Sequence, residues 1–291
     1  LPRASQMLVA TGVSYLKSIP GCRQFGVSVA LTGAIDHTAA VFANPGATGF
    51  LREWQWSASY TRWIPDVYDA AIFYGRGIAL PWSRRARMAL GVSYLGIKDF
   101  DSTNGREPIG YGDEGLVTFS IGQPLSVLSE HLSFGGNLKF FHSSLAQFSA
   151  SSVVFDAGLL FRTPKFSLLR SGLGIFDEAI FSAGIAVTQL GGALRFQSVQ
   201  TPVPRTLRAG FALNTGSHRG VQMALSADYR RIRDEQPFTA IGIEFSWQHL
   251  LYWRGGYQFE KNNVLGHVAF GLSIGLDDTR SNLPGPNSAA R

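Results

Sequence analysis

The chain has 291 residues, of which 16% are charged and 12% aromatic, and its mean hydropathy is +0.05. Soluble domains carry roughly 25% charged residues, and a helical membrane protein would be far more apolar. No run of 18 apolar residues occurs, which excludes a membrane-spanning helix. The net charge of +6 comes from scattered Lys and Arg, so nucleic acid is not an expected partner. Anionic lipid headgroups or a polar lumen explain the basic excess more simply.

Residues 1–52 differ from the rest of the chain. The opening residues lack the charged and then apolar pattern of a signal peptide, so we expect a processed start. Short helices are predicted over 12–17 and 32–43, and Asn44-Pro45-Gly46 indicates a turn. We expect this segment to fold into the lumen of the strand domain that follows.

Alternation of apolar with small or polar residues recurs from residue 53 to residue 276. In the first such stretch Trp54, Trp56 and Tyr60 share one face, and Gln55 and Ser57 share the other. Arg76 disturbs the apolar phase of the second stretch. The pattern predicts twelve strands, over 53–61, 68–80, 86–97, 117–121, 132–140, 153–162, 181–188, 207–214, 221–230, 241–247, 253–259 and 267–274.

The fold class expected is all-β, a transmembrane antiparallel β-barrel with a luminal plug of short helices. A soluble β-sandwich is the alternative, because one face of its strands also alternates. Two features favour the barrel. The non-apolar face is rich in Gly, Ala and Ser with charges at mid-strand, and Trp and Tyr gather near strand ends, as in an interfacial girdle.

The connections between strands differ in length. The segments 98–112 and 191–204 are long and polar, and both fall outside the cell if the first strand rises from the periplasm. The segment 163–178 is then an unusually long periplasmic connection. Residues 277–291 form a predicted flexible tail, and both chain ends are expected in the periplasm.

Several motifs resemble the PorV/PorQ family, within the wider group of barrels like the fatty-acid transporter FadL. The resemblance runs from about residue 12 to residue 276. Its motifs are Gly33-Ala34-Ile35-Asp36, Asn44-Pro45-Gly46-Ala47, and the stretches 132–139, 152–161, 202–210 and 253–259. Two departures are visible: family members usually have Asn-Pro-Ala-Gly, and they continue into a final hairpin.

The resemblance implies a fold of fourteen strands in the bacterial outer membrane, where twelve are visible in this sequence. It also implies a component of type IX secretion machinery that binds a translocon and receives exported proteins. Other relatives accompany surface filaments. The partners expected on this basis are proteins, together with the bilayer and its lipopolysaccharide. Plug residues carried over from the family motif are Gly33, Asp36, Asn44 and Pro45.

Charged residues on the inward face form a predicted ion network. Lys139 and Asp156 lie on neighbouring strands, and the others come from four consecutive strands. The network is either a polar pathway with a ligand site, or a set of braces that hold the plug; the braces are favoured, because charge facing lipid costs roughly 2–4 kcal/mol at the midplane. Its members are Lys139, Asp156, Arg208, Asp228, Arg230, Glu244 and Arg254.

Catalysis is not expected. His142 beside Ser143 is the best nucleophile and base combination, but adjacent strand residues point to opposite faces. No metal-ligand spacing, phosphate-binding loop or nucleotide fingerprint occurs, so no metal or cofactor is expected.

Three functions therefore compete. The first is a protein-docking barrel with a filled lumen and an apolar patch on its long loops, for which Ile109, Tyr111, Phe196 and Val199 are the candidates. The second is a FadL-like channel for hydrophobic molecules, which needs an apolar interior. The third is a lipid-modifying enzyme, which needs a Ser/His/acid cluster near one rim. The small and charged inward faces favour the first.

Overall fold

The computed structural model describes residues 14–18, 27, 30–34, 39–51, 54–64, 67–81, 83–97, 112–125, 131–145, 148–167, 177–196, 199–216, 220–233, 235–248, 250–260 and 267–274. The predicted tail 277–291 lies outside these residues. The described chain is almost entirely antiparallel β-sheet with a few short helices. No described helix is long and apolar enough to span a bilayer.

All twelve predicted strands are present, most of them longer than the alternation alone indicates. They form one antiparallel path in which each strand pairs with its neighbours along that path. The path runs β1 (Trp54–Ile64), β2 (Val67–Leu80), β3 (Ser83–Ile97), β4 (Gly112–Pro124), β5 (Leu132–Leu145), β6 (Phe148–Arg162), β8 (Glu178–Gly191), β11 (Thr206–Gly216), β12 (Val221–Ile232), β13 (Phe238–Trp247), β14 (Leu251–Glu260) and β15 (His267–Ile274).

Three short strands lie off this path. β7 (Phe166–Ser167) pairs with β8 inside the long connection predicted over 163–178. β9 (Leu194–Phe196) and β10 (Val199–Thr201) form a separate hairpin between β8 and β11. A fourteen-stranded path, as the family resemblance implies, is not found among the described residues, where β1 and β15 are the two edges of the sheet.

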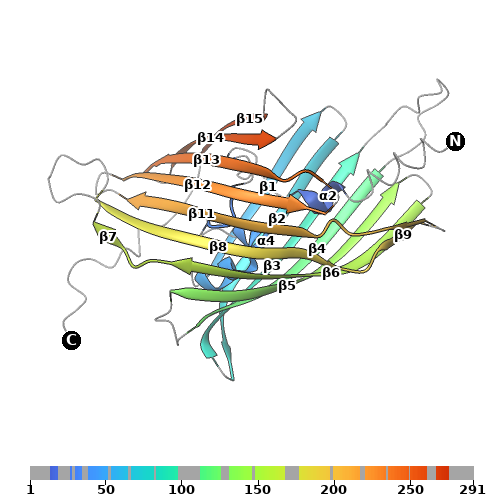
Figure 1. Ribbon diagram of the computed structural model, residues 1–291, viewed down its shortest axis with the longest axis horizontal. Coiled ribbons are helices and arrows are strands. Elements are labelled where there is room, and N and C mark those ends of the chain that lie inside the picture. Colours follow the sequence, from blue (N-terminus) through green and yellow to red (C-terminus); the bar gives the residue numbers. More distant parts are fainter. Residues whose placement is uncertain are drawn as a thin grey trace.

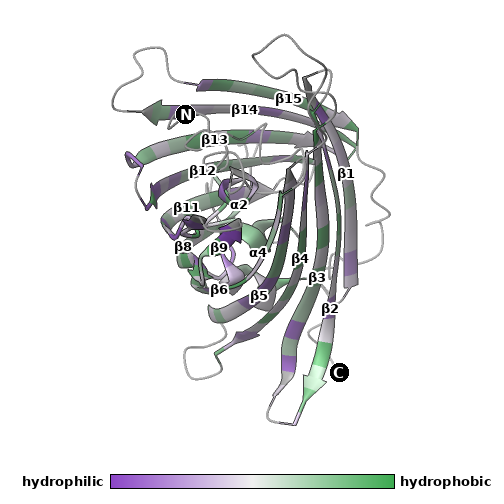
Figure 2. Ribbon diagram, turned by 90° about the vertical axis from the view of Figure 1, so that its right-hand side faces the viewer, coloured by the Kyte–Doolittle hydropathy of each residue, from purple (hydrophilic) through white to green (hydrophobic). Residues whose placement is uncertain are grey.

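The sheet curves around the N-terminal helices. In Figure 1 the strands β11 to β14 pass in front of β1 to β4, with α4 between the two layers. The view at 90° shows the strands wrapped around α2 and α4 (Figure 2). The concave face of the sheet is therefore the inner face, and the convex face is the outer one.

The two faces carry opposite chemistry. Large apolar side chains stand exposed on the outer face, with Trp54 67% exposed, Ile72 63% and Phe155 53%. Buried polar and charged side chains lie on the inner face, among them Asn137 and Asp156. A soluble protein buries its apolar face instead. The β-sandwich alternative predicted that arrangement, and the described strands have the reverse.

Short helices on the inner side make up what is called here the inner segment, the described residues from Ser14 to Leu51. It contains α2 (Ser14–Lys17), α4 (Ala40–Ala43) and the 3-10 helix η1 (Pro45–Phe50). The predicted turn at Asn44 is the start of η1, where the Asn44 side chain accepts a hydrogen bond from the Gly46 N–H and Pro45 takes the first position.

The helix predicted over 32–43 is wrong at its start, over 32–34, and residues 35–38 lie outside the described residues. Leu31 to Ala34 make a turn, and the helix is described only from Ala40. The backbone N–H of Thr32 donates to the Asp228 carboxylate on β12, and its carbonyl accepts from Asn44. These tertiary contacts replace the helical hydrogen bonds that local propensity favoured.

The hydrophobic core lies between the inner segment and the sheet. Phe42 packs against Phe73 of β2 with 4.7 Å between ring centroids, and Phe50 lies under the Arg162 guanidinium. The β9–β10 hairpin contributes Leu194, which is fully buried in the same cluster as Leu16. The core thus consists of one face of the inner segment and the inward side chains of the sheet.

Candidate functional site: the filled inner face of the sheet

Lys139 and Asp156 form a buried ion pair, with 2.6 Å between Nζ and Oδ2. Asp156 faces Asn137 directly in the β5–β6 register, so Lys139 reaches it diagonally, two residues along its strand. Asn137 donates both to Asp156 and, over 3.0 Å, to the Val41 carbonyl of the inner segment. The ion pair therefore belongs to the attachment of α4.

A bulge in β8 completes this group. The register between β6 and β8 shifts between Phe155 and Ala157, where Thr188 and Gln189 of β8 stand opposite the single residue Asp156. Its Oδ1 accepts from the backbone N–H of Gln189, a residue with a φ of 56°. The Gln189 side chain then donates to the Leu16 carbonyl over 2.7 Å. One carboxylate thus organises contacts to α2 and α4.

Asp228 on β12 holds the turn of the inner segment. Its two oxygens accept from the backbone N–H of Leu31 and Thr32, and from the Thr32 hydroxyl over 2.5 Å. Asp228 is 4% exposed, so these bonds replace its hydration. The carboxylate binds backbone that would otherwise carry buried N–H groups without partners.

Two arginines lie side by side next to Asp228. Arg208 and Arg230 face each other in the β11–β12 register and are 2% and 6% exposed. Arg230 donates to the Lys17 carbonyl at the end of α2, where helix carbonyls lack partners. Nε and Nη1 of Arg208 have no hydrogen-bond partner in the described structure. Arg208 is held there by packing and by the nearby carboxylates of Asp228 and Asp156.

Glu244 and Arg254 are a separate pair. Arg254 Nε lies 2.5 Å from Glu244 Oε2, and its Nη1 contacts the Ser273 hydroxyl on β15. The two side chains are 10% and 12% exposed, more than those of the Lys139–Asp156 pair. The seven predicted charges therefore fall into three groups: Lys139 with Asp156, Arg208 and Arg230 with Asp228, and Glu244 with Arg254.

Close backbone packing holds the other end of the inner segment. A Cβ at Gly135 of β5 would stand 2.0 Å from the Pro45 carbonyl oxygen, so only glycine fits under η1. A Cβ at Gly33 would stand 2.6 Å from the backbone of Phe211 on β11, and the Gly33 carbonyl accepts from Ser182. The Asn44 side chain donates to the Leu159 carbonyl of β6.

A further polar group was not predicted from the sequence. The Tyr15 hydroxyl of α2 lies 3.5 Å from Asp69 on β2, and Glu114 accepts from Ser143 between β4 and β5. Burial, and then the Asp69 carboxylate, raise the pKa of Tyr15 above its ordinary value. In the sequence, Asp69 and Glu114 are acidic residues at inward positions of β2 and β4. Tyr15, which contacts Asp69, is 54 residues away along the chain, so no local pattern indicates this pair.

The described residues include only part of the predicted plug and loop sites. Gly33, Asn44 and Pro45 all contact the sheet as described above, whereas Asp36 lies outside the described residues. Ile109 and Tyr111 also lie outside them. Phe196 and Val199 pair with each other at the tip of the β9–β10 hairpin, whose Leu194 and Thr201 are buried. The hairpin therefore packs against the core through Leu194, so part of the loop that was predicted to face outward is buried.

His142 and Ser143 point to opposite sides of β5, as their adjacency predicts. His142 is exposed and contacts the Ser151 hydroxyl over 2.9 Å, and Ser143 is buried against Glu114. No group of three or more metal-ligating side chains occurs in the described part of the chain. The chemistry that the inner face offers is hydrogen bonding and charge pairing to the backbone of the inner segment.

No protein-family model matches the chain, and comparison with curated proteins gives no significant match. The resemblance to the PorV/PorQ family therefore rests on the motifs quoted above. Among them, Asn44-Pro45 and the 132–139 stretch are in contact in the structure, through Pro45 and Gly135.

Proposed function

We propose that this chain is a β-barrel of the bacterial outer membrane, with the inner segment as its plug. The observation that carries the proposal is the inversion of the sheet: apolar side chains cover the convex face, and buried polar side chains face the concave side. Strands of 10 to 15 residues, such as β14 and β6, are long enough to cross a hydrocarbon core when tilted. Closure requires β1 to meet β15.

We further propose that the barrel docks proteins and does not conduct small molecules. The inner segment occupies the concave side, where Asp228 bonds it directly and Asp156 through Gln189, η1 packs on Gly135, and the β9–β10 hairpin folds onto it. The FadL-like alternative needs an apolar passage, and the side chains on the inner face are mostly small or charged. The family resemblance supports a docking role in a type IX-like secretion or surface-attachment machine.

Membrane insertion is tested with lipids brominated in their acyl chains. Trp54, Trp56, Trp247 and Trp253 are all exposed. Their fluorescence should fall strongly in vesicles of brominated lipid and little with a quencher dissolved in the water. Efficient quenching from the water alone would contradict the membrane location.

A pair of variants sharpens that test. Ile72→Arg places a charge on the outer face of β2 and should lower insertion, because arginine facing lipid costs about 2–4 kcal/mol at mid-membrane. Ser59→Arg, on the inner face of neighbouring β1, is the matched control and should insert like the wild type. Equal insertion of both variants would count against the assignment of the two faces.

Docking is tested by affinity purification from detergent-solubilised membranes of the native host. Recovery of a large membrane assembly or of secreted proteins in stoichiometric amounts supports the proposal. Co-purification of fatty acid without a protein partner would overturn it in favour of the transport channel.

A further inference from the structure

Three exposed arginines lie close together at one end of the β11–β12 pair. Arg205 comes directly before β11, Arg231 lies in β12, and Arg233 follows that strand. The Arg233 backbone N–H donates to the Arg205 carbonyl over 2.8 Å, which extends the ladder by one pair beyond Thr206 and Ile232. Arg205 and Arg233 therefore stand opposite each other, and Arg231 is the diagonal neighbour of Arg205. These three residues are called here the arginine cluster.

The arginine cluster lies on the outer face of the sheet. Side chains two residues apart on a strand share a face, so Arg205 lies on the side of Leu207, and Arg231 on the side of Tyr229. Leu207 is 47% and Tyr229 43% exposed, whereas Ile232 between two of the arginines is buried. The outer surface thus carries apolar side chains and, directly beyond them at the end of the strands, a group of cations.

The arginine cluster is electrostatically unfavourable on its own. A guanidinium group is always charged, and like charges directly opposite on neighbouring strands destabilise a sheet. No hydrogen bond or ion pair of the Arg205 or Arg231 side chain is found among the described residues. Glu235, a described acid that follows β12, lies 2.5 Å from Lys17 Nζ, and Asp234 lies outside the described residues. Arg205 and Arg231 therefore favour an anion supplied from outside the described chain.

Strand pairing places the arginine cluster at the same end of the sheet as the segment 98–111. Thr206 of β11 pairs with Thr188 near the end of β8, and from there the pairs run through β6 and the end of β5 to Gly112, where β4 begins. In Figure 1 the start of β11 lies with β9 at the right-hand end. Long connections such as 98–111 are typical of the extracellular end of outer-membrane barrels. At that end the lipid is lipopolysaccharide, whose lipid A carries phosphate groups above its acyl chains.

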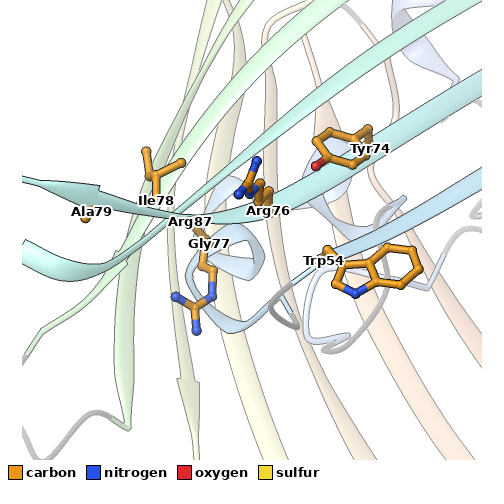
Figure 3. Close-up of a pocket in the computed structure, with 7 residues that line it drawn as sticks. All are labelled: Trp54, Tyr74, Arg76, Gly77, Ile78, Ala79 and Arg87. Atoms are coloured by element: carbon orange, nitrogen blue, oxygen red, sulfur yellow. The ribbon is translucent and has the colours of Figure 1, made fainter.

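At the opposite end, Arg76 of β2 and Arg87 of β3 stand on different faces of the sheet. Figure 3 shows the cavity there, with Arg76 on the side of Trp54 and Tyr74 and with the Arg87 guanidinium directed to the other side of β2. The Arg87 Nε donates to the Leu51 carbonyl of the inner segment. One phosphate group cannot contact arginines on both faces of a sheet. Arg76 is thus a single outer-face arginine, which makes it a suitable control for the arginine cluster.

We propose that the arginine cluster binds the phosphate groups of lipid A in the outer leaflet, with Arg205 and Arg231 as the principal ligands. The fork of a guanidinium matches two phosphate oxygens, and a long arginine side chain reaches the headgroup level from the end of an apolar band. The acyl chains of the lipid then lie along Leu207 and Tyr229. The inference deepens the proposed function and rests on the membrane location given there.

The test is native mass spectrometry of the purified full-length protein in detergent, titrated with lipid A. Wild type should retain lipid A, and Arg231→Gln should weaken its binding about tenfold, the usual effect of losing one charged hydrogen bond. The double variant Arg205→Gln/Arg231→Gln should lose more, and Arg231→Lys, which keeps the charge but loses the fork, should lose less. Arg76→Gln removes an exposed outer-face arginine from the opposite end of the sheet and is the matched control, expected to bind like the wild type.

Other outcomes would overturn the proposal. Equal binding by wild type and the double variant, or an equal loss in Arg76→Gln, removes the site. Equal binding of lipid A and of dephosphorylated lipid A removes the recognition of phosphate. Binding of phosphatidylglycerol as tight as that of lipid A, or displacement of lipid A by millimolar inorganic phosphate, overturns the choice of lipid A. Quenching by brominated lipid is measured on the same samples. Insertion without selective binding removes only this inference, whereas failure of the wild type to insert removes the proposed barrel as well.

Discussion

The strands that the inner segment covers and the strands that it leaves uncovered differ sharply. In β4 six of 13 residues are buried, alternating with partly or fully exposed ones. None of the described residues of β1, β14 or β15 is buried, and Phe270 on β15 is 85% exposed. The difference shows that the inner segment, and not the sheet alone, creates the protein's core. The edge strands β1 and β15, with β14, have no such core among their described residues.

The largest effect is expected from removing the anchor of the covered region. Asp228→Ala leaves the Leu31 and Thr32 backbone without its acceptor and leaves Arg208 buried beside one carboxylate fewer. Loss of one partner of a buried charge group costs about 3–5 kcal/mol. Urea unfolding in detergent, followed by tryptophan fluorescence, measures the change. A loss below about 1 kcal/mol would show that Asp228 does not hold the inner segment.

The second largest loss of stability is expected from disturbing the packing of η1 on β5. Gly135→Ala puts a methyl group into the Pro45 carbonyl, and overpacking of this kind costs about 1–3 kcal/mol. Gly136→Ala is the matched control, because its Cβ would meet only the Asp156 carbonyl oxygen at 3.5 Å. Limited proteolysis of the N-terminal region should be faster in the first variant alone. Equal proteolysis rates for the two variants would show that the contact between Gly135 and Pro45 does not hold the inner segment.

A smaller effect is expected at the edge of the uncovered region. Glu244→Ala removes a carboxylate of the same charge as Asp228, but its partner Arg254 keeps the Ser273 hydroxyl and is 12% exposed. The loss of one charged hydrogen bond costs about 1.5 kcal/mol. Urea unfolding should rank Glu244→Ala well below Asp228→Ala. The reverse ranking would remove the distinction between the two regions.

The smallest effect at neutral pH is expected from Tyr15→Phe, because the Tyr15–Asp69 contact is long at 3.5 Å. The raised pKa of Tyr15 makes the effect depend on pH. Below about pH 10 the phenol is protonated in both folded and unfolded chains, and above it the unfolded chain loses the proton first. Wild type should therefore lose stability as the pH rises above 10, and Tyr15→Phe should lose less. Parallel pH profiles would contradict this.

The sequence was sufficient to predict the strands, because alternation with period two reports the face of every residue without knowledge of its partners. It also placed Lys139 and Asp156 on neighbouring strands. It could not predict the contacts of Asn137 and Gln189 with the inner segment, or that of Tyr15 in this segment with Asp69. Those contacts join residues 54 to 173 positions apart. Their geometry depends on the bulge in β8 opposite Asp156 and on where the inner segment lies, which no local pattern encodes.

The hydrogen bonds from Asn44 and Asp228 have a consequence for the order of assembly. The inner segment is synthesised first, yet Asn44 bonds a carbonyl 115 residues later and Leu31 bonds a carboxylate 197 residues later. Such long-range contacts close slowly, because chain entropy is lost before they form. The early residues therefore remain without these partners until β6 and β12 have been synthesised. The inner segment then serves as the template on which the later strands assemble.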